Sequence, residues 1–326
     1  MRVLLCLVCL ALASPLAAQS RTDKPVITMG VRVDAKPFAW YDRSNDSFLG
    51  FLVDICTDAV TRAGYPFTQV AIDAATRAAF LKGEGPKIDL LCDPTTITLH
   101  RIQRFIDLGN DGNTPERFAF SPIVFVANGT FVTAKNDDYG ILTEPADPAL
   151  CHGHPAPEPA AEENGDPAPP VHFAAGFVTG TTVDEVLKDI VARNLLNLGE
   201  NQFACPVPQP SHSEGIAAFC RGDLRYYFGD LDIVNAYVRE QATLNHEPCE
   251  FDVSSVATSY EPYAFVVTSK TPGFRPDFNK AIYEVFYHGT AIDRFKGHFE
   301  GMDMSAFLET LFRINQIPEG SPQTDP

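Results

Sequence analysis

The chain has 326 residues, with 25 Lys and Arg against 42 Asp and Glu, and its formal net charge at pH 7 is -17. This charge argues against nucleic acid and anionic membrane surfaces as partners, because both need a basic footprint on the protein.

The first residues have the pattern of a secretory signal peptide. Arg2 supplies a positive charge, residues 3–13 form an apolar core, and small residues precede Gln19. That core is shorter than the roughly 20 apolar residues that span a bilayer. We therefore expect residues 1–18 to be removed and the mature protein to be soluble and periplasmic. The remaining length is more than one hydrophobic core usually serves, which predicts two lobes.

Two of the eight cysteines lie in the predicted signal peptide, and the even remainder permits three disulfides in an oxidising compartment. The six cysteines beyond the predicted signal peptide form no CxxC pair that would favour zinc or redox chemistry. Cys56 lies near the start of a predicted helix and Cys92 at the end of a predicted strand, so we favour a disulfide between them. The sequence leaves four cysteines unassigned, which are Cys151, Cys205, Cys220 and Cys249.

Strands and helices alternate through the first hundred residues. In chain order we predict a strand at 26–33, an extended aromatic loop at 37–41, a helix at 50–64, a strand at 67–72, a helix at 74–81 and a strand at 88–91. This alternation predicts a parallel sheet, and ligands of such sheets bind beyond the carboxyl ends of the strands. The aromatic side chains of the loop are candidates for the core, and we expect Phe38 to line the cleft.

A polar run with one arginine follows the strand at 88–91. Residues 95–98 would expose N–H groups and hydroxyls where a helix begins, and anions bind at such positions. Arg101 can lie one turn into this helix and hold a carboxylate through two parallel hydrogen bonds, which lysine cannot do. The alternative is a helix capped by Thr98 with a surface arginine.

The composition changes at residues 144–170, which are rich in proline, alanine and acids and cannot pack a core. We expect an exposed, disordered insertion in the second lobe. The elements predicted after it are a strand at 171–178, helices at 183–198 and 214–221, a strand at 225–228, a helix opened by residues 229–230, a strand at 263–268, and helices at 277–287 and 291–299.

The order of these pieces resembles the family 3 periplasmic solute-binding proteins, in the branch that binds glutamate, aspartate or amino acids generally. The resemblance runs along the chain through GVRVDAKPFAWYD, GFLVDIC, TTITLHR, TGTTVDEVL, SHSEGIAAFCRGD, YFGDLDIV and EPYAFVVTSK. It implies a type II periplasmic binding protein fold, with two α/β lobes joined by two hinge crossovers. Lobe one would comprise residues 24–121 and 263–326, and lobe two residues 122–262.

The resemblance also implies the ligand site of an amino-acid carrier that delivers to an ABC permease in the inner membrane. Arg101 and Thr96 would bind the α-carboxylate, the Pro94 carbonyl would accept from the α-ammonium, and Asp230 would supply the counter-charge. A zwitterion enclosed away from water needs both charges matched. The other residues expected to contact the ligand are Arg32, Phe38, Arg77, Thr181, Thr182 and His212.

Side-chain specificity is expected from Arg32, Arg77 and His212, which match positions that contact the distal carboxylate of an acidic ligand. Ala74 departs from that branch, where a hydroxyl is expected, so a broader polar amino-acid binder stays open. His212 has the alternative of simple exposure in a polar loop. Asp230 could cap the helix that it opens.

Two other functions compete with transport. The same fold carries dehydratases of cyclic acids, for which Asp230 or His212 would be the general acid or base. A ligand sensor that docks on a membrane receptor is the second alternative. We expect a monomer without a cofactor. We also expect no metal site, because the adjacent potential ligands of CHGH at residues 151–154 rarely make a closed site.

Overall fold

The structure is a computed structural model, and it describes residues 24–110, 117–135, 140–142, 151, 170–246, 248–254 and 259–318. The predicted signal peptide and most of the predicted insertion lie outside these residues. Within the described part of the chain, no helix is long and apolar enough to cross a membrane.

Lobe one is built on a five-stranded sheet with the order β5-β1-β6-β15-β7. Its strands are β1 (Ile27–Arg32), β5 (Phe67–Ile72), β6 (Leu90–Cys92), β7 (Phe118–Phe120) and β15 (Val266–Thr268). β1 runs parallel to β5 and β6, whereas β15 is antiparallel to β6 and β7. The parallel core confirms the sheet expected from alternating strands and helices, and it brings the carboxyl ends of β1 and β6 to one edge.

Helices and a small second sheet complete lobe one. The helices are α1 (Phe51–Arg62), α2 (Ala74–Phe80), α3 (Leu99–Asn110), α7 (Phe274–Tyr287), α8 (Thr290–His298) and α9 (Ala306–Asn315), and the small sheet contains β2 (Asp34–Ala35), β3 (Ala39–Asp42) and β4 (Ser47–Leu49). α1 contacts α7 and α8 and buries an apolar face that includes Leu52, Ile55 and Ala59. These contacts join the two sequence segments of lobe one, because α1 and α7 are far apart in the chain.

Lobe two has its own sheet with the order β11-β10-β12-β8-β13, in which β9 also pairs with β10 and β14 with β8. Its strands are β8 (Phe125–Ala134), β9 (Ile141–Leu142), β10 (Val171–Val178), β11 (Gln202–Gln209), β12 (Tyr226–Asp230), β13 (Phe251–Val253) and β14 (Ser259–Tyr263), and its helices are α4 (Thr182–Ala192), α5 (His212–Cys220) and α6 (Leu231–Asn245). β10 is parallel to β11 and β12.

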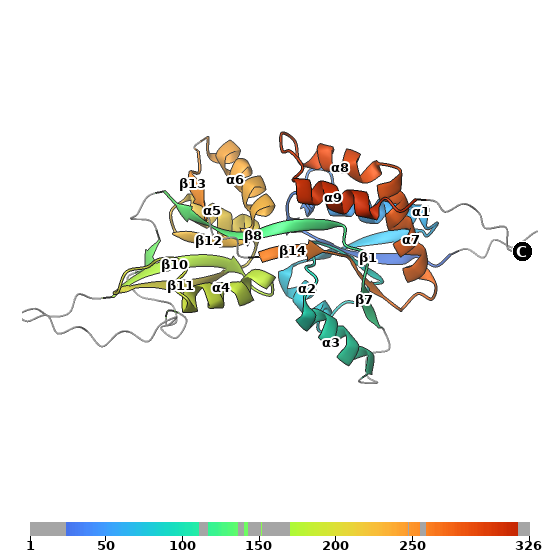
Figure 1. Cartoon of the computed structure of the whole chain (residues 1–326), viewed down its shortest axis with the longest axis horizontal. Coiled ribbons are helices and arrows are strands. Elements are labelled where there is room, and N and C mark those ends of the chain that lie inside the picture. Colours follow the sequence, from blue (N-terminus) through green and yellow to red (C-terminus); the bar gives the residue numbers. More distant parts are fainter. Residues whose placement is uncertain are drawn as a thin grey trace, which may run out of the picture.

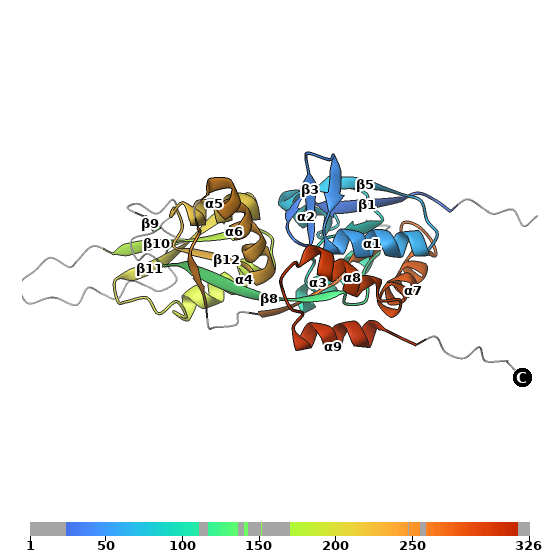
Figure 2. The ribbon, with the colours of Figure 1, turned by 90° about the horizontal axis from the view of Figure 1, so that it is seen from above.

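β8 and β14 cross between the lobes. Figures 1 and 2 show two bodies side by side, with β8 extending from one into the other. The two strands pair antiparallel from Phe125 with Tyr263 to Gly129 with Ser259. The α/β fold with two lobes and two crossovers is therefore confirmed. The division of the chain at 121/122 and 262/263 stays a prediction.

Several element boundaries differ from those predicted. Residues 39–41 of the expected aromatic loop belong to β3, and the strand expected at 263–268 is split between the end of β14 and β15. The split arises because the N–H groups of Ala264 and Phe265 donate to Thr95 O and Ser121 Oγ, each at 3.0 Å. α4 ends at Ala192, six residues earlier than predicted, where Asn194 takes a left-handed conformation with φ 48°.

Three disulfides link the described cysteines. Cys56 in α1 and Cys92 in β6, the pair favoured from the sequence, are joined with their Cα atoms 6.1 Å apart. The structure assigns the cysteines that the sequence left open, as Cys151 with Cys205 and Cys220 with Cys249.

Candidate functional site

The loop at residues 93–98 follows β6 and is fixed against the second crossover strand. Thr96 forms an isolated antiparallel bridge with Tyr263, and the N–H of Ile97 donates to the carbonyl of Pro262 at 2.8 Å. The loop therefore lies at the hinge, where it faces both lobes. Pro94 is half-buried within it.

Arg101 lies in the first turn of α3, as expected. Its backbone N–H donates to Thr98 Oγ1 at 3.1 Å, so Thr98 caps the helix. Its guanidinium Nη1 donates to the carbonyl oxygen of Thr96 at 2.7 Å. The cap and the predicted carboxylate contact are thus compatible, because the same loop supplies Thr96 and orients the half-buried arginine.

Asp230 lies where β12 ends and α6 begins. Its side chain makes no capping hydrogen bond and instead accepts from the hydroxyl of Tyr263. Its Oδ1 is buried and has no hydrogen-bond partner among the described residues. Burial, with Glu261 close by, raises the pKa of Asp230 well above its usual range. A ligand cation would relieve both the unpaired oxygen and the cost of ionising this carboxyl.

Glu261 is a buried carboxylate that sequence reasoning missed. It lies in β14, is 1% exposed, and accepts hydrogen bonds from Thr96 of lobe one and Thr182 of lobe two. Ser259 also donates to it, at 2.8 Å. Its place before a Pro-Tyr pair in the motif EPYAFVV was the available signal. Glu261 therefore links the two lobes at the hinge. The hydroxyl of Thr181 instead donates to the Val178 carbonyl, at 2.7 Å.

Arg32 and Arg77 each form an ion pair with a carboxylate of this chain. Arg77 is 4% exposed and pairs through Nε with the fully buried Asp93, while its Nη1 reaches the Gly180 carbonyl of lobe two at 3.2 Å. Arg32 is 3% exposed and pairs through Nε with Asp34. The sequence predicted the two arginines but neither carboxylate.

His212 is the first residue of α5 and is 5% exposed, so the alternative of an exposed histidine is wrong. Its Nδ1 lies 2.9 Å from the hydroxyl of Tyr227. Burial lowers the pKa of His212 to about 4, opposed by Asp34 and reinforced by Arg32 and Arg77. The imidazole is therefore neutral at pH 7 and adds no positive charge to the site.

Phe38 is fully buried among aromatic rings. It meets Phe125, Tyr263 and Phe299 edge to face, at centroid distances of 4.8, 5.2 and 5.6 Å. Phe38 therefore packs in the core beneath the hinge. A core position was one of the two possibilities that the sequence left open for this residue. A direct contact with ligand stays a prediction.

The two lobes touch at the rim of this region. Lys36 Nζ of lobe one pairs with Glu240 Oε1 of lobe two at 2.7 Å, and the Lys36 N–H donates to the hydroxyl of Tyr237 at 3.5 Å. α5 also contacts β2 across the interface. A cavity of about 510 Å³ opens here, with Lys36, Trp40, Tyr237 and Glu240 in its lining. Among the predicted site residues, Arg77 and Thr96 of lobe one contact Gly180 and Thr182 of lobe two.

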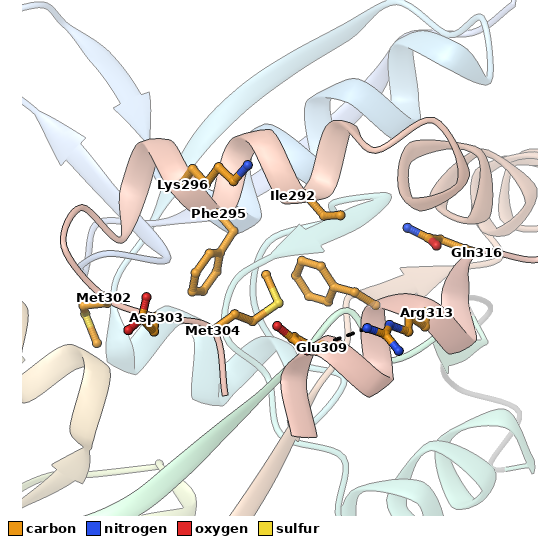
Figure 3. Close-up of a pocket in the computed structure, with 10 residues that line it drawn as sticks. Ile292, Phe295, Lys296, Met302, Asp303, Met304, Glu309, Arg313 and Gln316 are labelled. Carbon is orange, nitrogen blue, oxygen red and sulfur yellow. Dashed lines mark ion pairs between the residues drawn. The ribbon is translucent and has the colours of Figure 1, made fainter. Parts of the chain in front are cut away.

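Two further features lie away from the hinge. A cavity of about 420 Å³ between α8 and α9 has an apolar floor that includes Phe295 and Met304, with Lys296 and Glu309 at its edge (Figure 3). In lobe two, Cys151, His172 and Cys205 form the one cluster of three potential metal ligands among the described residues. The two sulfurs of this cluster are joined in a disulfide, so they are not thiolate ligands. The histidines of CHGH lie outside the described residues.

The family of bacterial extracellular solute-binding proteins, family 3, matches residues 27–300. The chain belongs to this family. No curated protein matches the sequence. The type II periplasmic binding protein fold is thereby shown for this chain.

Solved structures of amino-acid-binding proteins share the fold. An ancestral arginine-binding protein bound to arginine is 19% identical, with a TM-score of 0.59 over 85% of this chain and 99% of the other. The GluR0 ligand-binding core from Nostoc punctiforme with L-glutamate is 15% identical, with a TM-score of 0.55 over 84% and 99%. A putative ABC transporter binding component from Wolinella succinogenes complexed with lysine is 14% identical, with a TM-score of 0.57 over 85% and 97%.

Proposed function

We propose that this protein binds an α-amino acid between its lobes and delivers it to an ABC permease in the inner membrane. The observation that carries the proposal is the pair of complementary groups at the hinge. Arg101 is anchored beside Thr96 in lobe one, and Asp230 presents an unpaired buried oxygen from lobe two. A zwitterion held between them has both of its charges matched, which compensates for its desolvation.

The remaining predicted contacts fit this placement. The hydroxyls of Thr96 and Thr182 lie 3.5 Å apart across the interface, where both donate to Glu261, and they would turn from it to reach the α-carboxylate of a ligand. Pro94 would offer its carbonyl to the ammonium. An acidic side chain, glutamate or aspartate, is the finer prediction from Arg32 and Arg77. A periplasmic monomer without a cofactor stays part of the proposal.

A thermal-shift screen of the secreted protein against the twenty amino acids, dicarboxylates and cyclic acids tests the proposal. A ligand at a hundred times its Kd should stabilise the native state by about 2.7 kcal/mol. Asp230→Asn should abolish the shift given by amino acids, whereas a substitution at the distant Asp303 should leave it intact. Stabilisation by cyclic acids together with their turnover would favour the enzyme alternative.

A further inference from the structure

The charges on Arg32 and Arg77 are already balanced inside the protein. Each arginine is at least nine-tenths buried and pairs with a carboxylate of its own lobe, Asp34 or Asp93. The four groups lie in one cluster, because β1 and β6 are neighbouring parallel strands in which Val31 pairs with Cys92, so Arg32 and Asp93 follow at the same edge. Their formal charges cancel.

The two arginines differ in whether their guanidinium nitrogens have hydrogen-bond partners. Each of the three guanidinium nitrogens of Arg77 has a partner, with Nε on Asp93, Nη1 on the Gly180 carbonyl and Nη2 3.4 Å from Thr95 Oγ1. Arg32 uses Nε for Asp34, and its Nη2 is buried without a hydrogen-bond partner among the described residues. Arg32 Nη2 is therefore a buried donor that remains for a ligand side chain, and the cluster has no uncompensated positive charge.

We propose, on the basis of the proposed function, that Asp34 and Asp93 occupy the role that the distal carboxylate of an acidic ligand would have. The cleft then selects an amino acid whose side chain is uncharged and offers a hydrogen-bond acceptor, as a carboxamide does. The carbonyl of a carboxamide satisfies Arg32 Nη2 without adding charge. A ligand carboxylate would bring a third negative charge into a buried cluster in which two carboxylates already balance the two arginines, and its hydrogen bonding to Arg32 would not offset that cost.

Arg32 Nη2 also disfavours a ligand with a cationic side chain. Its donors would meet Arg32 Nη2, another donor, and the nearest carboxylates are already engaged by the two arginines. His212 does not change this balance, because its buried imidazole is neutral at pH 7. The proposal thus replaces the acidic ligand predicted from the sequence with a neutral analogue of nearly the same size and shape.

Calorimetric titration with glutamine, glutamate and arginine tests the proposal in the secreted protein and its variants. The wild type should bind glutamine at least about tenfold more tightly than glutamate or arginine, and Asp93→Asn should reduce the glutamine preference over glutamate by at least about tenfold. Asp34→Asn should act in the same direction and serves as the second variant if Asp93→Asn does not fold. Asp58→Asn, which removes a carboxylate from Arg294 at 3.0 Å outside the cleft, is the matched control and should leave the ratio unchanged.

The outcomes separate the two proposals. Tighter binding of glutamate than glutamine by the wild type overturns the inference but leaves amino-acid binding intact, and so does an unchanged ratio in both aspartate variants. Tighter binding of arginine overturns it in favour of a cationic ligand. The absence of any amino-acid binding overturns the proposed function, and the inference with it.

Discussion

The buried imidazole of His212 should make folding stability depend on pH. Its folded pKa is about 4, against an ordinary value of 6.5, so between these values the unfolded chain binds a proton that the folded protein does not. The free energy of unfolding therefore falls as the pH falls through this window. From pH 7 to pH 4.5 the loss amounts to about 2.5 kcal/mol.

Urea unfolding of the wild type and of His212→Gln at several pH values measures this contribution. The half-buried Asp232, whose pKa burial raises to about 6, has the opposite sign in an overlapping window. It is present in both proteins and cancels in their difference. The stability advantage of the wild type should shrink by about 2–3 kcal/mol between pH 7 and 4.5, because glutamine does not titrate. A difference that is constant with pH would refute the reasoning, since it would mean that His212 accepts a proton in the folded state as readily as in the unfolded chain.

Three further predictions concern the ligand, the rim and the disulfides. Arg101→Lys should weaken amino-acid binding by about 2 kcal/mol in calorimetry, because lysine loses the planar two-donor contact, whereas Arg104→Lys in the same helix should have no effect. Lys36→Met removes a partly exposed cross-lobe ion pair and should cost about 0.2–1 kcal/mol of affinity, and this cost should vanish in 1 M salt; a loss that persists there would contradict an electrostatic role. Replacing Cys220 and Cys249 by serine opens a loop with a sequence separation of 29 and should lower the free energy of unfolding by about 3–4 kcal/mol, a prediction that an unchanged urea midpoint would contradict.

Local sequence signals predicted the elements whose limits are set by their own residues. β5 runs from Phe67 to Ile72 as expected, because Pro66 precedes it and Asp73 caps the next helix by accepting from the Thr76 N–H. α9 was missed although its sequence carries a helix signal. Leu308 and Phe312 recur at helical spacing, and Ser305 caps the helix by accepting from the Leu308 N–H.

The site also contains residues that local sequence predicts and residues whose roles depend on tertiary contacts. Thr96, Thr98 and Arg101 belong to one short segment, and their arrangement follows from a strand end and a helix start. The pairing of Arg77 with Asp93 depends on where α2 packs relative to the end of β6, which is a tertiary relation that spacing does not encode. The buried position of Glu261 likewise depends on both lobes meeting at β14, so the motif EPYAFVV marked the residue but not its contacts.

The paired crossovers determine which contacts between the lobes are near the axis of any bending. Phe125 and Tyr263, at the lobe-one end of the ribbon, are fixed by packing around Phe38, whereas at the other end Gly129 lies between Ser259 of β14 and Asp230 of β12. Asp230 is thus held beside the crossover strand by its register with Gly129, whereas Glu240 lies further along α6. A rotation of lobe two about the crossovers should therefore displace the Lys36–Glu240 pair at the rim more than it displaces Asp230.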